Sequence, residues 1–179
     1  MRVTLDLVLD CSPDAAWEAV HSPAVFRAVS GPITTAESLE PGGFPSRWPG
    51  GGHRVRLRML GALPMGTQLI RLSDEIAPGV RTVHDTGGPL SGPMRVVRSW
   101  HHQMAISAVP AGARPVSGSA AGAASSPAER TRFRDTLTVR AGVLTPFVTA
   151  GFWVFWQLRA RQIRRLAPGW DAQFGVAAP

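Results

Sequence analysis

The sequence predicts an α+β fold in which an antiparallel sheet packs around a long C-terminal helix. The longest helical signal covers 143–167. Thr145 can cap its first turn, and Pro146 fits the first helical position. Pro168 and Gly169 then end it. Most of the chain before this helix alternates apolar and polar residues, as strands with one buried face do. The turns between these strands are too short for the crossover helices of a parallel sheet, so antiparallel pairing is expected.

Each element before that helix has its own local signal. Residues 3–9 alternate and predict the first strand. Ser12 and Pro13 provide the cap and first position of a helix. Ser22 and Pro23 do the same for a second short helix. Further strands are expected at 33–39, 53–60, 68–76, 80–86, 94–106 and 131–139.

Two long loops interrupt the strands. The loop 41–52, rich in Gly and Pro, holds Phe44 and Trp48. These aromatic residues either form a lid over a pocket or plug one end of the core. The segment 109–130 consists mostly of Ala, Gly, Ser and Pro and has too little apolar surface to order itself. It is therefore expected to be a mobile hairpin loop.

The long helix is expected to have two different halves. The first half is apolar around most of its circumference, so it must be buried in protein or in lipid. Its large apolar residues are Phe147, Val148, Phe152, Trp153, Val154, Phe155 and Trp156. The uncharged run 141–158 is at the lower length limit of a membrane span, which is the alternative to burial inside the domain. The second half can lie on a core with its arginines in water. These are Arg159, Arg161, Arg164 and Arg165.

The composition of the 179 residues narrows the class of protein. One domain is expected over 1–168, followed by a tail at 169–179. The formal charge is +7 and every basic residue is Arg, but no reading helix is recognisable, so nucleic-acid binding is not expected. The single cysteine, Cys11, allows neither an internal disulfide nor a thiolate cluster.

Targeting and cofactor signals are missing from the sequence. No signal-peptide pattern precedes the first strand, and a cytoplasmic location is therefore expected. The sequence contains no phosphate-binding loop, dinucleotide fingerprint or set of His and carboxylate residues with metal-ligand spacing. We therefore expect neither a cofactor nor a metal.

The two strands 94–106 and 131–139 place ionisable residues on faces that otherwise look like core. If they pair as a hairpin with residue numbers summing to about 237, His102 lies opposite Asp135. A buried carboxylate needs such a partner. Two interpretations stay open. His102, polarised by Asp135, could act as a general acid or base at a cavity wall, or the pair could only fix the register of the strands. In the same register Trp100 lies opposite Leu137.

Arg98 and His84 are further candidates near this pair. Arg98 lies four positions before His102 on the same face and could bind a carboxylate, phenolate or enolate oxygen. The alternative is an arginine at the strand end whose charge reaches water. His84 joins the group if its strand presents even-numbered residues inward. His101 is expected to face solvent.

Several stretches, taken together with the order of elements, resemble one known superfamily. They are 12–20 (Ser-Pro-Asp-Ala-Ala-Trp-Glu-Ala-Val), 100–102 (Trp-His-His), 131–137 (Thr-Arg-Phe-Arg-Asp-Thr-Leu) and the final helix, aromatic and then Arg-rich. From residue 3 to about 166, the chain resembles the helix-grip fold of the START/Bet v 1-like (SRPBCC) superfamily, in particular its polyketide cyclase/dehydrase-like members. The resemblance implies a curved sheet wrapped around the helix and an elongated apolar cavity that takes a hydrophobic small molecule. It also favours burial of the aromatic half of the helix.

The resemblance makes a bacterial cyclase or dehydratase acting on a polyketide-like substrate the leading expectation. The chain has no tyrosine, so the tyrosine-dependent mechanism of some cyclases is ruled out. In its place Arg98 would hold an oxyanion, His102 would move a proton and Asp135 would orient it. The residues expected to contact the ligand are Trp100, His84, Met59, Leu57, Ile70, Phe133, Phe152 and Phe155.

Two other functions remain open. One is a non-catalytic carrier of a lipid or isoprenoid, which would use the same cavity without proton transfer. The other is a membrane-associated protein anchored by the final helix. Contact with a membrane surface and the oligomeric state are left open.

Overall fold

The computed structural model describes residues 1–109 and 130–175 and has the α+β, helix-grip architecture that the sequence predicts. Its strands form a five-stranded antiparallel sheet, in the order β1-β9-β8-β6-β5, and a four-stranded one, in the order β2-β3-β4-β7. The strands are β1 (Arg2–Leu9), β2 (Thr34–Ser38), β3 (His53–Met59), β4 (Leu63–Ile70), β5 (Leu72–Ala77), β6 (Val80–Asp85), β7 (Gly88–Pro89), β8 (Ser99–Ala108) and β9 (Thr131–Arg140).

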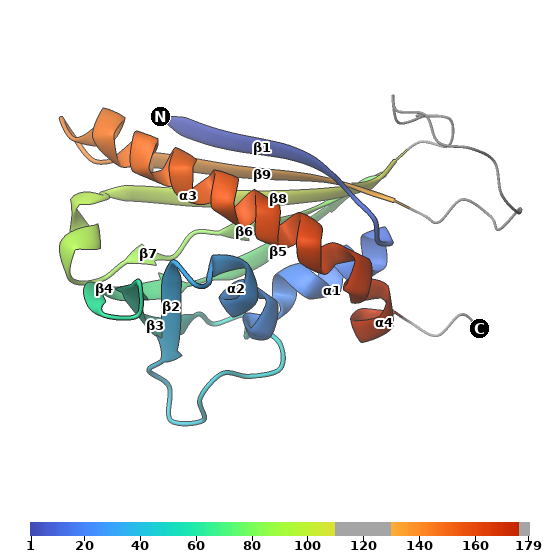
Figure 1. Cartoon of the computed structure of the whole chain (residues 1–179), viewed down its shortest axis with the longest axis horizontal. Coiled ribbons are helices and arrows are strands. Elements are labelled where there is room, and N and C mark those ends of the chain that lie inside the picture. The colour runs from blue at the N-terminus through green and yellow to red at the C-terminus, as the bar shows by residue number, and fades with distance from the viewer. Residues whose placement is uncertain (110–129, 176–179) are drawn as a thin grey trace, which may run out of the picture.

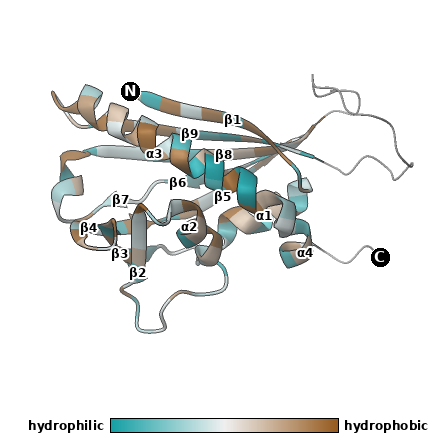
Figure 2. Ribbon diagram, viewed as in Figure 1, coloured by the Kyte–Doolittle hydropathy of each residue, from teal (hydrophilic) through white to brown (hydrophobic). Residues whose placement is uncertain are grey.

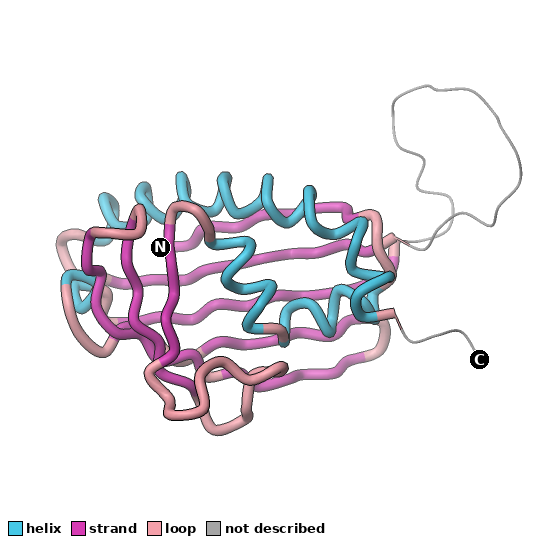
Figure 3. The backbone as a smooth tube through the Cα atoms, turned by 60° about the horizontal axis from the view of Figure 1, so that its bottom comes forward, coloured by secondary structure: helices cyan, strands magenta, loops and turns pink. Residues whose placement is uncertain are grey.

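The helices lie together on the inner side of these strands. They are α1 (Pro13–His21), α2 (Pro23–Ser30), α3 (Thr145–Leu166) and α4 (Trp170–Phe174), with the short 3₁₀ turns η1 (Pro93–Val96) and η2 (Ala167–Gly169). The long helix α3 runs along the five-stranded sheet, and the strands of the four-stranded sheet run across one end of the molecule (Figures 1 and 3). Helix α2 packs against α3.

The short helices begin where the sequence predicts. The Ser12 hydroxyl oxygen accepts a hydrogen bond from the Ala15 N–H at 3.2 Å, and that of Ser22 accepts one from the Val25 N–H at 3.4 Å. Each cap satisfies one N–H group of a first helical turn, which has no partner within the helix. The alternation of the first strand is confirmed too, since its inward residues are at most 6% exposed. They are Val3, Leu5, Leu7 and Leu9.

Helix α3 buries one stripe of side chains and leaves part of its apolar surface exposed. The buried residues are Thr149, Trp156, Arg159, Ala160 and Ile163, with the three- and four-residue spacing of one helix face. The prediction that the whole aromatic half is buried is wrong, because Phe147 is 77% exposed and Trp153 is 56% exposed. Figure 2 shows apolar residues at this end of the helix. Within the described ranges no helix is both long and apolar enough to cross a bilayer.

Two of the predicted strands differ from the strands of the structure. The expected strand 68–76 is broken at Arg71, where the chain passes from one sheet to the other, because the Arg71 N–H donates to the Asp85 carboxylate and its carbonyl accepts from Thr86. Residues 93–96 form η1 instead of a strand, since Gly92 (φ 74°) and Pro93 turn the chain there.

The segment that was expected to be a tail begins with a short helix, α4, which packs on α1. Trp170 is 3% exposed, and the Asp171 carboxylate accepts hydrogen bonds from the Ser12 N–H and hydroxyl. In the loop 41–52, Trp48 is buried against Val55, Leu57 and Ile70. The predicted hairpin loop 109–130 falls mostly outside the described residues.

Candidate functional site

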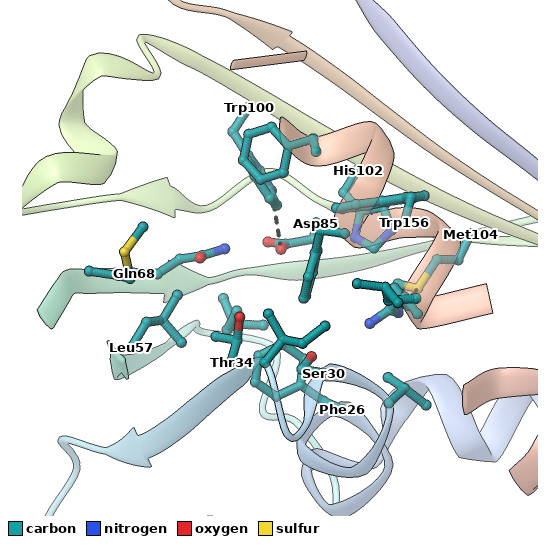
Figure 4. A pocket seen from close by; sticks show the side chains of 18 of the residues that line it. Phe26, Ser30, Thr34, Leu57, Gln68, Asp85, Trp100, His102, Met104 and Trp156 are labelled. Carbon is teal, nitrogen blue, oxygen red and sulfur yellow. Dashed lines mark hydrogen bonds between the residues drawn. The ribbon is translucent and has the colours of Figure 1, made fainter. Parts of the chain in front are cut away.

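A cavity of about 530 Å³ lies between α2, α3 and the inner faces of both sheets. This volume is within the range of small-molecule pockets. Most of its lining is apolar and aromatic, and a few polar side chains interrupt it (Figure 4). The polar lining residues are Ser30, Thr34, Gln68, Asp85, His102 and Arg159.

His102 on β8 and Asp135 on β9 are in contact, as the sequence predicts. The His102 Nε2 atom lies 2.6 Å from Asp135 Oδ1. The predicted register is wrong, however, because His102 pairs with Leu137, Trp100 with Val139 and Met104 with Asp135. A slip of two residues leaves every side chain on the same face, so alternation fixes the face but not the register. The imidazole therefore reaches the carboxylate diagonally.

Asp135 is fully buried and accepts hydrogen bonds from side chains of two elements. His102 lies on β8, while Trp156 (Nε1 to Oδ1, 2.9 Å) and Arg159 (Nε to Oδ2, 3.1 Å) lie on α3. Burial by itself raises the pKa of this carboxyl, but the charge and hydrogen bond of His102, together with Arg159 and Trp156, lower it to about 2. The group is therefore a carboxylate, and its hydrogen bonds connect α3 to the five-stranded sheet.

The second ring nitrogen of His102 has no hydrogen-bond partner among the described residues. A carboxylate only accepts hydrogen bonds, so Nε2 of His102 must donate to Asp135, which leaves Nδ1 as the acceptor of the neutral ring. Nδ1 makes no hydrogen bond to the described residues. Among those residues no solvent-inaccessible side-chain nitrogen or oxygen lacks a partner, so Nδ1 is accessible, and His102 lines the cavity. A ligand in the cavity can thus meet a hydrogen-bond acceptor oriented by a buried carboxylate.

Asp85 forms a second polar centre in the same cavity. It is 4% exposed and lies directly opposite His102 in the β6–β8 pairing. Its Oδ1 atom accepts from the N–H groups of Arg71 and Gly87, each at 3.0 Å, and its Oδ2 atom accepts from Trp100 Nε1 at 3.3 Å. All three partners are donors, and Oδ2 keeps accepting capacity for a ligand.

Gln68 on β4 adds an amide to this centre. It is 6% exposed, and its side chain makes no hydrogen bond to the described residues. In Figure 4 the amide points across the cavity toward Asp85. Because no solvent-inaccessible side-chain nitrogen or oxygen of the described residues lacks a partner, the Gln68 amide is accessible, and as a cavity-lining group it can bind an oxygen or hydroxyl of a ligand.

Arg98 and His84, two of the predicted site residues, do not line the cavity. Arg98 is exposed and precedes β8, because η1 and the turn after it replace the first part of the predicted strand. Its guanidinium carbon lies 3.9 Å from the point that a Cβ on Gly142 would occupy. Strand β6 presents its odd-numbered residues inward, so His84 lies on the outer face, where its ring nitrogens contact His101 at 3.1 Å and Glu75 at 2.9 Å.

The structure places the remaining predicted residues at the cavity wall. Trp100, Leu57, Met59, Ile70, Phe133, Phe152 and Phe155 all line it. His101 is half-buried under His84 instead of facing solvent freely, with the two rings stacked 5.4 Å apart. Within the described residues no group of three side chains is placed to hold a metal ion.

Sequence reasoning missed Asp85, Gln68 and Arg159 as site residues. Arg159 was expected in water, but it is 9% exposed and contacts Asp135. Its spacing of three from Trp156, on the buried stripe of α3, is the signal that could have identified it. Asp85 could have been found only if the inward face of β6 had been assigned correctly.

Comparisons with known proteins identify the fold. No protein-family model matches the chain, and no curated protein matches it in sequence. Among solved structures, a Chromobacterium violaceum protein is similar over 93% of this chain and 96% of its own, with a TM-score of 0.58 and 12% identity. The Zhui aromatase/cyclase from Streptomyces sp. R1128 is similar over 98% and 99%, with a TM-score of 0.52 and 17% identity.

A third similar structure is the di-domain aromatase/cyclase BexL from the BE-7585A biosynthetic pathway. It matches over 92% of this chain and 45% of its own, with a TM-score of 0.52 and 14% identity. The chain therefore has the fold of solved aromatase/cyclases.

Proposed function

We propose that the protein is a cyclase- or dehydratase-like enzyme that binds an apolar, oxygen-bearing molecule in the cavity and moves a proton at His102. The observation that carries this proposal is the orientation of His102. Its Nε2 atom is held at 2.6 Å by Asp135, and its Nδ1 atom is accessible on a residue that lines the cavity. The similarity in fold to two aromatase/cyclases supports the same class of reaction.

The proton transfer that we propose needs only the imidazole. Nδ1 of neutral His102 takes a proton from a carbon next to a ligand carbonyl, and the electron pair moves onto the carbonyl oxygen as an enolate. The imidazolium is stabilised by the Asp135 carboxylate. In a dehydration, the enolate then expels a β-hydroxyl, which takes the same proton from Nδ1 and leaves as water. In a cyclisation, the enolate carbon attacks a second carbonyl, whose oxygen takes the proton.

The second polar centre would orient the ligand for this step. The Gln68 amide can donate to a carbonyl oxygen, and Asp85 Oδ2 can accept from a hydroxyl. Asp85 and His102 are neighbours on adjacent strands, so a ligand bound at the first lies beside the second. The oxyanion role that the sequence suggested for Arg98 is dropped, because this residue is outside the cavity.

A non-catalytic carrier is the second candidate function. It is favoured by one observation, namely that the Asp135 network joins β8, β9 and α3 and so has a structural purpose without any chemistry. In a carrier, the apolar lining would bind a lipid or isoprenoid. His102 would then only stabilise the contact between α3 and the sheet through its hydrogen bond to Asp135.

Turnover measurements on a His102 variant separate the two functions. The probe is a linear poly-β-ketone thioester, whose ring closure and loss of water are followed by liquid chromatography and mass spectrometry. Binding is followed separately through the tryptophan fluorescence of the wall. We expect wild type to accelerate ring closure, and His102→Ala to bind the probe but lose about a hundredfold or more in rate. The matched control is His84→Ala on the outer face, which should keep the wild-type rate. Binding without turnover by wild type, or equal rates for wild type and His102→Ala, would overturn the enzyme proposal.

A further inference from the structure

We propose that the mouth of the cavity docks on an anionic lipid bilayer. The docking region, called the mouth surface below, combines exposed apolar residues with unpaired arginines. Its apolar members are Val143, Leu144, Phe147, Trp153 and Val154, and its arginines are Arg95, Arg98 and Arg140. The proposal goes beyond the proposed function, because it concerns how the cavity meets its ligand and not what happens inside.

The apolar part of the mouth surface is large for a surface that faces water. Val143 is 91% exposed, Phe147 77%, Trp153 56%, Val154 53% and Leu144 46%. Phe147 and Val154 are seven residues apart, so they lie on one face of α3, away from the buried stripe. A surface helix normally turns a polar face to solvent, and this half of α3 does not. Exposed apolar patches of this kind mark interaction sites.

The mouth surface adjoins the opening of the cavity. Most lining residues are shielded from solvent, but Pro93, Val96, Gly151 and Val154 are exposed although they line the cavity. They mark the opening, which therefore lies between η1 and the first half of α3. Val154 belongs to both the opening and the apolar patch. A molecule that leaves a bilayer at this point would enter the cavity without crossing water.

The arginines give the mouth surface a positive charge that no acidic residue in the described ranges pairs with. Arg95, Arg98 and Arg140 are exposed, and their side chains make no hydrogen bond or ion pair with the described residues. The Arg98 N–H donates to the Arg140 carbonyl at 2.7 Å, so the two residues are adjacent. The parts of the chain that carry these residues, 86–101 and 136–157, contain no Asp or Glu. By contrast, Arg132 and Arg134 elsewhere on the surface are both paired with Asp6.

This combination fits an anionic membrane better than a second copy of the chain. Trp and Phe side chains enter the boundary between headgroups and acyl chains, while arginines bind anionic headgroups. In a twofold dimer built on the same surface, the arginines of the two copies would approach one another without acidic partners. The charge therefore favours an anionic partner, and the exposed apolar residues favour a lipid one.

Vesicle co-sedimentation of the full chain tests the proposal. The vesicles are phosphatidylcholine alone or mixed with phosphatidylglycerol, at low and high salt. We expect the wild type to sediment with the anionic vesicles at low salt and much less with neutral vesicles or at high salt. The triple variant Arg95→Gln, Arg98→Gln, Arg140→Gln should lose about a hundredfold in apparent affinity. Phe147→Ser with Trp153→Ser should also abolish sedimentation.

Two controls match these variants in charge and exposure. Arg161, Arg164 and Arg165 are exposed near the other end of α3, so changing all three to Gln removes the same charge elsewhere and should leave binding almost unchanged. Ile76→Ser removes an apolar side chain that is 76% exposed on β5 and should also have no effect.

The outcomes that overturn the proposal are distinct. Equal loss in both arginine triples would show that only the net charge matters. Absence of vesicle binding would overturn the proposal as well. In that case, a dimer that is seen in gel filtration and disappears in Phe147→Ser would assign the surface to a second copy of the chain. Binding of polyglutamate would assign it to an acidic protein instead. The measurement uses no substrate, so its failure leaves the proton-transfer proposal unaffected.

Discussion

At the scale of single residues, the inner face of the five-stranded sheet carries two carboxylates with different partners. Asp135 accepts hydrogen bonds from three side chains, one of them the cation Arg159. Asp85 accepts from two backbone N–H groups and one indole N–H. Asp135 therefore contributes mainly to holding α3 and orienting His102, whereas Asp85 keeps accepting capacity for a ligand.

Asp135→Asn should destabilise the protein strongly. The change leaves Arg159, which is 9% exposed, without its counterion, and removal of one partner of a buried ion pair costs about 3–5 kcal/mol. Urea unfolding measures the loss. The matched control is Asp6→Asn, which removes the carboxylate that pairs with the exposed Arg132 and Arg134 and should cost clearly less than the change at Asp135. Similar losses in the two variants would show that the Asp135 network does not stabilise the fold.

The lowered pKa of Asp135 predicts how the stability of the protein depends on pH. In the folded protein the pKa of Asp135 lies at about 2, below the ordinary 3.8. Its stabilising contribution is therefore complete above about pH 4 and is lost as the pH falls through about 2. Between these pH values the wild type should lose about 2 kcal/mol more of its unfolding free energy than Asp135→Asn does. Parallel stability curves for the two proteins would contradict this assignment.

Gln68→Leu should separate ligand binding from stability. Its amide makes no hydrogen bond to the part of the chain that the structure describes, so an apolar side chain of similar size should change the unfolding free energy by less than about 1 kcal/mol or increase it. The affinity for 2-naphthol, an apolar probe with one hydroxyl, should fall about tenfold in a fluorescence titration. Met65→Leu on the same strand changes the lining without removing a hydrogen-bonding group and should bind normally. An unchanged affinity in Gln68→Leu would remove this amide from the binding site.

At the scale of elements, the sequence predicted what local signals determine. Serine caps followed by proline define the starts of α1 and α2, and Pro168 with Gly169 marks the end of α3 within a residue or two. The alternation of apolar and polar residues is also a local signal, and it predicted which faces of β1, β3 and β9 are buried. It could not predict the β8–β9 register, because a shift of two residues preserves every face.

The inward face of β6 was ambiguous in the sequence. Val80 and Val83 have opposite parity, and so do His84 and Asp85, so neither apolar nor polar residues settle which side is buried. The structure settles it through long-range contacts, since Asp85 accepts from Arg71 where the two sheets meet. This is why Asp85 was missed and His84 was proposed in its place.

The junction of the two sheets depends on Gly87. A Cβ at this position would lie 1.9 Å from the carbonyl oxygen of Leu69, so any side chain would push β4 away from the turn after β6. We expect Gly87→Ala to lower the unfolding free energy by at least about 3 kcal/mol and to weaken 2-naphthol binding, because Asp85 and Gln68 would move apart. Gly79→Ala, where φ is 77° and no atom is within 4 Å, should cost only about 1 kcal/mol. Equal losses at the two positions would contradict the close approach.

At the scale of the whole molecule, the two sheets and the helices surround a cavity that packing alone does not require. Well-packed domains leave few voids larger than a water molecule, so a space of about 530 Å³ supports the proposed binding of a small molecule. The architecture was predictable, because the order of elements and the resemblance both pointed to it. The position of the cavity opening was not predictable from the sequence. It depends on which side of α3 remains uncovered, and η1 takes the place of the first part of the predicted strand 94–106 there.

The most direct test of the central claim is a long-range ¹H–¹⁵N spectrum of the histidine rings, recorded while 2-naphthol is added. The account predicts that the neutral ring of His102 carries its proton on Nε2, facing Asp135, and that the Nδ1 resonance shifts as the naphthol hydroxyl hydrogen-bonds to it. The Nε2 resonance should change little. A proton on Nδ1 of the neutral ring, or an Nδ1 resonance that does not respond when naphthol binds, would contradict the account.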